Sequence, residues 1–337
     1  MSCAPGHVET SVGYTVRSYR DDDEAGVLRL LDLCFNPWPG KQLFVDAAEH
    51  LRWKMGSYPD SEDRHVVAES DGEIVGFRLS LAQSVVVRGR ELLLHQGMDS
   101  AVHPGHRGKG LMARMQDYEI GAIRRTHDIC LMGLSMHPAM SALRARRGHH
   151  RFANRIETLR RDAPQARVNS AAGVGREYTS FDGRVDALWR AASAQFDFAV
   201  VRTASYLNWR YCDRRAGPFV VLVAEQGESM TGYLILCTRG KRGCIADMLV
   251  LPGREDILGG LVEDALEHFS DAGVARTECW MAERHPYRDA LMASGFVRRN
   301  RHSEFGYLPL RVPHEELAVL DGRDAVIHLM AGDVDWI

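Results

Sequence analysis

The sequence lacks several features that would assign it to a protein class at once. No apolar run approaches the roughly 18 residues of a membrane-spanning helix, and residues 1–13 lack the basic and then apolar pattern of a secretion signal. The seven cysteines are scattered, with no C-x-x-C pair and no spacing typical of metal ligands. We therefore expect a soluble, cytoplasmic protein with reduced thiols, no membrane association and no bound metal.

Charge also excludes a class of partner. The formal net charge is -3, with 26% charged residues, so no global basic surface for nucleic acid is expected. Only four of the 42 basic residues are lysines, a bias more typical of genome composition than of binding. Phosphate-binding motifs of the P-loop and dinucleotide types are missing as well. Binding sites must therefore be sought in local patterns.

The chain repeats itself. Three stretches of the first half match stretches of the second half in the same order and at a nearly constant offset. They are "HLRWKM" (50–55) with "YLNWRY" (206–211), "VVAESDGEIVG" (66–76) with "LVAEQGESMTG" (222–232), and "MDSAVHPG" (98–105) with "ADMLVLPG" (246–253). The repeat predicts two copies of one fold of about 150 residues each, in line with the usual size of a domain. We place the first copy at 1–162, a linker at 163–177, the second copy at 178–312 and a tail at 313–337.

Within the first copy the patterns predict a mixed order of elements. Helical periodicity follows the acidic start at residues 21–23 and recurs in 43–54 and 109–125. Residues 66–102 contain β-rich runs separated by turn residues, which is typical of an antiparallel meander. Residues 152–161 predict a strand that closes the copy. This order indicates an α+β fold with a mostly antiparallel sheet flanked by helices.

A glycine-rich stretch, "RGKGLM" (107–112), lies where the meander gives way to a predicted helix. Backbone N–H groups at the start of a helix attract phosphate. Gly108 and Gly110 let a ligand approach the backbone, while Arg107 and Lys109 can add charged contacts. The stretch therefore favours a phosphate-binding loop.

This stretch resembles the signature of the GCN5-related N-acetyltransferases (GNATs), R/Q-x-x-G-x-G/A, at Arg107 and Gly110; Met112 departs from it. The resemblance extends over nearly the whole chain and implies two tandem acyl-CoA N-acyltransferase folds. It implies acetyl-CoA as the co-substrate, with its pyrophosphate held by the loop. The residues expected to bind the coenzyme are Ala101, Val102, Arg107, Gly108, Lys109, Gly110, Leu111 and Met112.

The second copy departs from this signature. It keeps the family's Gly-Phe at Gly295 and Phe296, yet its loop reads "REDILGG". Acidic Glu255 and Asp256 would repel phosphates, and Leu258 replaces the glycine at the close approach. We therefore expect a degenerate second copy that shapes the acceptor pocket or supports a dimer, and one working coenzyme site in the first copy.

Direct transfer from a thioester to an amine needs a free-base amine, which is roughly one molecule in a few thousand at pH 7 for an alkylamine. Asp99 is the first candidate for the general base, although Asp247 repeats it in the second copy, which fits a structural role equally well. His95 is the second candidate. The family's usual acid, a tyrosine, is replaced by Arg144, which leaves Tyr118, another residue or water to protonate the thiolate. Backbone N–H groups near 100–102 are expected to stabilise the oxyanion.

Two further stretches carry open alternatives. Aromatic residues after the first helix of each copy either line a pocket or pack in the core, with core packing favoured; they are Phe35, Trp38, Phe196 and Phe198. Trp53 and Trp209, repeated in both copies, are expected in the core. The C-terminal "HLMAGDVDWI" is expected to be a docked tail with solvated carboxylates at Asp333 and Asp335, or else an acidic contact to an amino-sugar ammonium.

The function that these patterns favour is an acetyl-CoA-dependent N-acetyltransferase of bacterial small-molecule metabolism. Its acceptor would be an amine of an amino sugar, an antibiotic or a biosynthetic intermediate, or a cysteinyl amine. The alternative is a non-catalytic module that binds acyl-CoA or another ligand on the same folds. Either would be a monomer or a homodimer.

Overall fold

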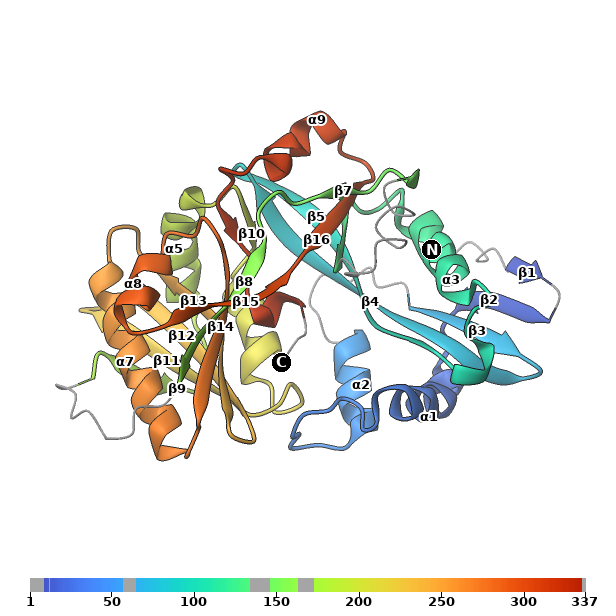
Figure 1. Ribbon diagram of the computed structural model, residues 1–337, viewed down its shortest axis with the longest axis horizontal. Helices are drawn as coiled ribbons and strands as arrows, with labels where there is room; N and C mark the ends of the chain where they lie inside the picture. The colour runs from blue at the N-terminus through green and yellow to red at the C-terminus, as the bar shows by residue number, and fades with distance from the viewer. Residues whose placement is uncertain (1–8, 12, 57–64, 134–145, 163–172, 335–337) are drawn as a thin grey trace.

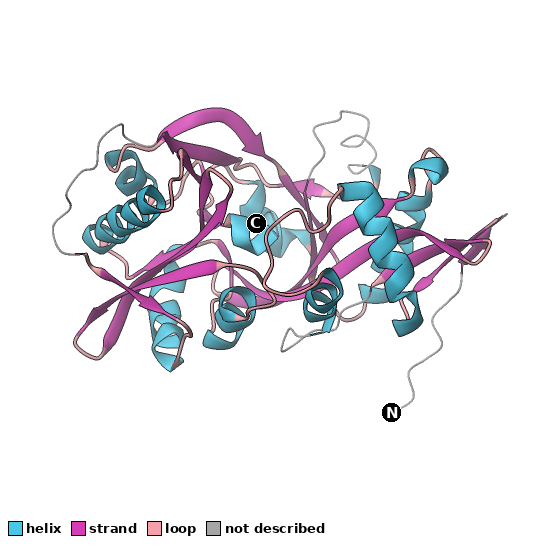
Figure 2. Ribbon diagram, turned by 90° about the horizontal axis from the view of Figure 1, so that it is seen from below, coloured by secondary structure: helices cyan, strands magenta, loops and turns pink. Residues whose placement is uncertain are grey.

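The strands form two sheets that lie side by side in the computed structural model (Figure 1). The structure describes residues 9–11, 13–56, 65–133, 146–162 and 173–334. Helices lie on both sides of the strands (Figure 2). The predicted α+β class is thereby confirmed. Residues 137–147, whose sequence also predicts a short helix, lie mostly outside the described residues.

The first sheet, sheet A, is built mainly from the first half of the chain. Its path is β1 (Glu9–Ser11), β2 (Tyr14–Ser18), β3 (Val66–Ser70), β4 (Glu73–Val87), β5 (Arg90–Val102), β6 (Ile129–Gly133), β16 (Phe305–Pro309) and β7 (His150–Arg151). All neighbours are antiparallel except β5 and β6, which helix α3 (Leu111–Ile123) connects. Helices α1 (Glu24–Phe35) and α3 both pack against β4 and β5. The meander and the helical crossover predicted from the sequence are confirmed.

Helix α1 forms because its apolar residues fall on one face. Val27, Leu30 and Leu31 recur at helical spacing and are all buried. Before it, Asp23 accepts two hydrogen bonds from Arg17 of β2, at 2.7 and 2.8 Å, which ties the helix start to the sheet. Helix α2 (Ala47–Gly56) follows and carries the repeated tryptophan, Trp53.

Sheet B repeats this plan in the second half. Its path is β15 (Val297–Ser303), β8 (Ile156–Asp162), β14 (Arg276–Ala282), β13 (Arg242–Val250), β12 (Ser229–Arg239), β11 (Phe219–Gln226) and β9 (Gly175–Tyr178). The helices of this half are α5 (Gly183–Ala192), α6 (Ala204–Leu207), α7 (Glu255–Asp271) and α8 (Arg288–Ala293). Strand β9 begins at Gly175, inside the last three residues of the expected linker, and residues 163–172 lie outside the described part of the chain.

The two halves exchange their last strands. Strand β8, from the first half, lies between β14 and β15 of sheet B, while β16, from the second half, lies between β6 and β7 of sheet A. The expectation that residues 152–161 close the first copy is therefore wrong: β8 closes the second. Both strands occupy the same position of the repeat, so either one fits either sheet, and the pattern of side chains cannot tell the two pairings apart.

Further contacts join the halves into one body. Strand β10 (Phe198–Val200) adds to β4 of sheet A and also pairs with β17 (Ile327–His328). The rings of Trp53 and Trp209 stack on each other, with centroids 5.0 Å apart and planes at 25°. One hydrophobic cluster, which includes both tryptophans, continues through the two halves.

Most of the aromatic residues with open roles are in the core. Trp53 and Trp209 are buried, as predicted, and so are Trp38, Phe196 and Phe198. Phe35 differs, because 47% of it is exposed. Only this residue of the aromatic stretches is left available for a pocket.

The C-terminal segment begins at the top of the molecule in Figure 1, and its last described residues contact both β4 and β13. It contains α9 (His314–Leu317), a 3₁₀ turn η5 (Ala318–Asp321), β17 and a 3₁₀ turn η6 (Ala331–Val334). Asp333 is 1% exposed and pairs with Arg202 at 2.8 Å, so the expectation of a solvated carboxylate is wrong for Asp333. Asp335 lies outside the described residues. Among the helices that the structure describes, none has both the length and the apolar character needed to cross a membrane.

Candidate active site

The glycine-rich loop leaves β5 and enters α3 with its backbone open to solvent. Gly108 and Gly110 have φ values of +77° and +76°, which side-chain-bearing residues rarely adopt. A Cβ atom at either position would meet nothing within 4 Å. Both glycines therefore serve the backbone conformation and leave free space in front of the loop.

Side chains hold the rest of this loop in place. Lys109 donates a hydrogen bond to the hydroxyl of Tyr14 on β2, at 3.0 Å, and the same hydroxyl lies 3.0 Å from Nδ1 of His106. Arg107 donates from Nε to the carbonyl oxygen of Val102, at 3.0 Å. Two cations are thus fixed beside the start of α3.

The start of α3 has the properties of an anion site. Gly110 occupies the N-cap position, so no side chain of a described residue caps the helix, and its first turn contains no acidic residue. The first N–H groups of any helix have no acceptor within the helix. Together with the helix dipole they favour negative charge at this point.

A pocket of about 350 Å³ opens in front of these groups. It is lined by Cys34, Phe35, Ser100, Ala101, Val102, His106, Arg107, Gly108, Gly110, Leu111 and Met112. Seven of the eight residues expected to bind the coenzyme are in this lining. The eighth, Lys109, is directed to Tyr14 instead.

Strand β5 separates from β6 at this pocket. The parallel ladder between them runs from Leu94 to Gln96, and beyond that point no pairing of β5 with described residues of β6 occurs. A β-bulge follows, in which Asp99 and Ser100 lie opposite the single residue Arg78 of β4. The φ of Asp99 is +39°, a left-handed value that aspartate and asparagine tolerate better than most residues. Next to the pocket β5 thus has an edge that no described residue of β6 pairs with, while the bulge lies on its β4 side.

Comparison with known proteins finds a family match that covers the pocket and the glycine-rich loop. Residues 15–140 match the family model described as "Acetyltransferase (GNAT) domain". This match contains β4, β5, the glycine loop and α3. This part of the chain is a GNAT domain. The match supports acyl transfer as the general chemistry of this domain.

Solved structures extend the likeness to both halves. A protein from Enterococcus faecalis V583, described as a "Probable N-Acyltransferase", has a TM-score of 0.66 at 12% identity, over 89% of this chain and 73% of that chain. Saccharomyces cerevisiae N-myristoyltransferase with bound myristoyl-CoA has a TM-score of 0.63 at 12% identity, over 91% and 85%. A GCN5-related N-acetyltransferase from Anabaena variabilis has 0.63 at 11%, over 87% and 72%. These likenesses show a shared tandem GNAT fold. No curated protein sequence matches the chain significantly.

Asp99, the first candidate for the general base, lies at the bulge and forms an ion pair. Its Oδ2 accepts a hydrogen bond from Nζ of Lys54 on α2, at 2.6 Å. The side chains of Lys54 and Asp99 are only 4% and 14% exposed. The carboxylate is therefore adjacent to the strand edge, although it is not in the lining of the pocket. The sequence analysis did not single out Lys54. The one indication of its importance is that it follows the repeated tryptophan Trp53, just as Arg210 follows Trp209 in the second copy.

The second candidate base, His95, lies under α3 in a buried polar cluster. Its Nδ1 is 3.0 Å from the hydroxyl of Ser80, and its Nε2 is 3.3 Å from Glu119 of α3. Arg78 donates to Glu119 at 2.6 Å and to the hydroxyl of Ser100 at 2.9 Å. This cluster supports the pocket from behind, since only Ser100 reaches the lining.

The charges of the neighbouring side chains determine the protonation state of Glu119 in this cluster. Burial would raise the pKa of Glu119, but the charges and hydrogen bonds of Arg78 and His95 lower it to about 2. Glu119 is therefore an ionised partner of Arg78 across the physiological range. A Cβ on Gly97 would collide with the guanidinium of Arg78, so that glycine gives the arginine its passage. The sequence analysis missed this ion pair, although each partner carries a signal. Glu119 falls four residues after Met115, on the buried face of α3. Arg78 is a single arginine within the apolar run of β4.

Tyr118, the candidate acid, is directed away from the pocket. Its hydroxyl lies 3.2 Å from that of Ser18 at the end of β2. Arg144, which stands at the usual position of the family's tyrosine, lies outside the described residues. The three candidate catalytic residues are therefore not gathered around the pocket: Asp99 lies beside it, His95 behind it and Tyr118 apart from it.

The corresponding region of the second GNAT copy has no open loop. Helix α7 already begins at Glu255, at the position that aligns with Arg107, and so runs through the stretch that forms the glycine loop in the first copy. Arg254 pairs with Asp256 at 2.9 Å beside the helix start. Leu258, which replaces Gly110, is fully buried. The backbone that forms an open loop in the first copy is therefore helical in the second.

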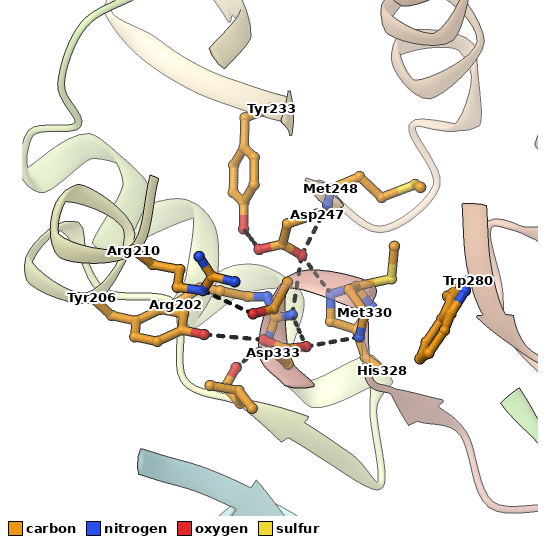
Figure 3. Close-up of polar contacts among 12 residues, drawn as sticks. Arg202, Tyr206, Arg210, Tyr233, Asp247, Met248, Trp280, His328, Met330 and Asp333 are labelled. Atoms are coloured by element: carbon orange, nitrogen blue, oxygen red, sulfur yellow. Dashed lines mark hydrogen bonds and ion pairs between the residues drawn. The ribbon is translucent and has the colours of Figure 1, made fainter. Parts of the chain in front are cut away.

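The counterpart of Asp99 is also enclosed. Asp247 is 0% exposed, accepts from the Tyr233 hydroxyl at 3.1 Å, and pairs with Arg202 at 3.1 Å (Figure 3). Arg202 reaches at the same time to Asp333 of the C-terminal segment, at 2.8 Å. Burial and the nearby Asp333 carboxylate raise the pKa of Asp247 to about 6, against the opposing charge of Arg202. The C-terminal segment thus helps to enclose Asp247 in the second copy.

Proposed function

We propose that the protein is an acyl-CoA-dependent N-acyltransferase with one working coenzyme site, in its first copy. The observation that carries this proposal is the pocket at the separation of β5 and β6, in front of the uncapped start of α3. Acetyl-CoA is the proposed acyl donor, and the acceptor is an amine of a small molecule such as an amino sugar, an antibiotic or a biosynthetic intermediate. The same lining could bind a coenzyme without turnover, and the assay below separates the two functions.

The pocket supplies a place for each part of the donor. N–H groups at the start of α3, with Arg107, fit the pyrophosphate. The thioester would then lie along the part of β5 that pairs with no described residue of β6, where a backbone N–H near Ala101 can stabilise the oxyanion. Once both substrates are bound, the amine nitrogen forms a bond to the carbonyl carbon and the carbon–sulfur bond breaks, which releases coenzyme A as the thiol.

Asp99 is the proposed proton acceptor for the amine. Its carboxylate lies at the bulge next to the proposed thioester position, where it forms an ion pair with Lys54. Direct contact, or contact through one water molecule, suits general-base catalysis. His95 and Tyr118 remain candidates only from the sequence, because neither reaches the pocket lining.

A thiol-release assay tests the proposed reaction. Purified full-length protein with acetyl-CoA and a panel of primary amines is expected to release coenzyme A only when a suitable amine is present. Mass spectrometry should find the product heavier by one acetyl group. Coenzyme binding without acetylation of any amine in a broad panel would favour the non-catalytic module instead.

Substitution Gly110→Glu is expected to weaken acetyl-CoA binding at least about 100-fold. A carboxylate about 4 Å from a phosphate is repelled by about 4 kcal/mol at the effective dielectric of a protein surface. Gly253→Glu is a matched control, because Gly253 precedes α7, has a φ of +75° and also has nothing within 4 Å of its Cβ position. Equal loss of affinity in both variants, measured by calorimetry, would show that strain and not the site is responsible.

Asp99→Asn is expected to lower kcat about 100-fold or more while the KM for acetyl-CoA changes little. Asparagine tolerates the left-handed backbone at this position, so the change removes charge without backbone strain. The pH profile of kcat should lose its acidic limb. An unchanged kcat would remove Asp99 from the mechanism and leave it as a structural partner of Lys54.

A further inference from the structure

The strand exchange brings together two histidines and an aspartate that are far apart in the sequence. His150 lies in β7, which belongs to the first half, whereas His314 begins α9 and Asp321 ends η5 in the second half. These elements meet because β16 is inserted next to β7. Figure 1 shows β7 and α9 close together at the top of the molecule.

Their donor atoms form a compact group. One ligand atom from each of His150, His314 and Asp321 lies within 4.8 Å of the other two. The imidazole rings of His150 and His314 stack, with centroids 3.6 Å apart and planes at 14°. Nε2 of His314 lies 2.7 Å from Oδ2 of Asp321. Side-chain exposures of 34% for His314 and 37% for Asp321 leave the group open to an ion from solvent.

A neighbouring tyrosine orients this group. The Tyr307 hydroxyl donates to Oδ1 of Asp321 at 2.8 Å, which leaves Oδ2 for the histidine side. The Tyr307 ring also stacks against His150, with centroids 5.4 Å apart. Neither ring nitrogen of His150 forms a hydrogen bond with a described residue.

We propose that His150, His314 and Asp321 bind a divalent transition-metal ion, with Zn²⁺ as the best match. Two imidazoles and one carboxylate are ligands that zinc accepts in tetrahedral sites, with a water molecule in the fourth position. A hydroxyl that holds the free oxygen of a ligating carboxylate is a typical outer partner. The sequence predicted no metal because the cysteine spacings were the basis of that expectation, and the histidines meet only through the exchanged strand.

Such an ion would fasten the exchange. It would connect β7 of the first half to the segment that follows β16, and so tie the inserted strand to its neighbour β7. Because the site requires both halves in the native arrangement, the ion would bind the folded protein and stabilise it. This role is independent of the acyl-transfer site.

Calorimetric titration of ZnCl₂ into untagged, chelator-treated full-length protein tests the proposal. Wild type is expected to bind one Zn²⁺ per chain, and added Zn²⁺ should raise Tm reversibly against EDTA. His150→Ala and Asp321→Asn are each expected to weaken binding at least about 100-fold, while both keep the wild-type Tm in EDTA. His268→Ala is the matched control, since His268 of α7 is also partly exposed and also lies beside a carboxylate, that of Glu177.

The outcomes separate clearly. Lack of saturable binding by wild type would overturn the proposal, and so would equal affinity in wild type and the Asp321→Asn variant. If His150→Ala fails to fold, Asp321→Asn alone decides, because its amide oxygen can still accept from Tyr307. Loss of binding in His268→Ala would show that zinc binds elsewhere, which would also contradict the assignment.

Discussion

A fragment of residues 1–162 is expected not to fold on its own. In this fragment sheet A lacks β16, so β6 and β7 lose the strand that joins them, and β8 has neither β14 nor β15 to pair with. Exposed strand edges of this kind favour aggregation over a native monomer. Far-UV circular dichroism and thermal melting should therefore show no cooperative transition for the fragment.

Co-expression supplies the control for this experiment. Residues 1–162 together with residues 173–337 are expected to form a soluble one-to-one complex with a single cooperative transition, because every exchanged strand then finds its partners. Cooperative unfolding of either fragment alone would contradict the exchange, since it would mean that each half can close its own sheet.

Arg202→Met is expected to destabilise the protein by about 3–5 kcal/mol. Arg202 is fully buried and its guanidinium lies between the carboxylates of Asp247 and Asp333. Without it, two carboxylates remain in a dry environment and lose the guanidinium that both of them contact, while Tyr206 still bonds to Asp333 at 3.2 Å. Urea denaturation should show a lower midpoint, and insolubility of the variant would be the extreme form of the same result.

Matched variants identify the cause of that loss. Arg190→Met removes an exposed arginine of α5 and is expected to change stability by less than about 0.5 kcal/mol. Asp333→Asn combined with Arg202→Met should recover part of the lost stability, since one unpaired charge is then removed. A destabilisation below about 1 kcal/mol for Arg202→Met would show that the cluster is not a stabilising ion-pair network.

The sequence was sufficient to predict the repeat, the sheet type and the loop. These features depend on local patterns: the spacing of apolar residues in α1 and α3, the turn residues of the meander, and glycines at the start of a helix. The matching offsets also placed Trp53 and Trp209 correctly in the core. Patterns of this kind survive because each is imposed by neighbours within a few residues.

The pairing of distant segments could not be predicted in the same way. Strands β8 and β16 hold equivalent positions, so both arrangements satisfy the same pattern, and only the whole chain selects the exchange. The ion pair of Lys54 with Asp99 and the contact of Arg202 with Asp333 also join segments far apart in sequence. Asp333 was expected in solvent because nothing near it in the chain indicates a buried arginine.

The central claim is that the first copy alone binds the coenzyme. Isothermal calorimetry of acetyl-CoA with the intact protein tests it most directly. One site per chain, present in the Gly253→Glu variant and lost in Gly110→Glu, is the predicted result. Two sites, no site, or a site that survives Gly110→Glu and disappears in Gly253→Glu would contradict the account.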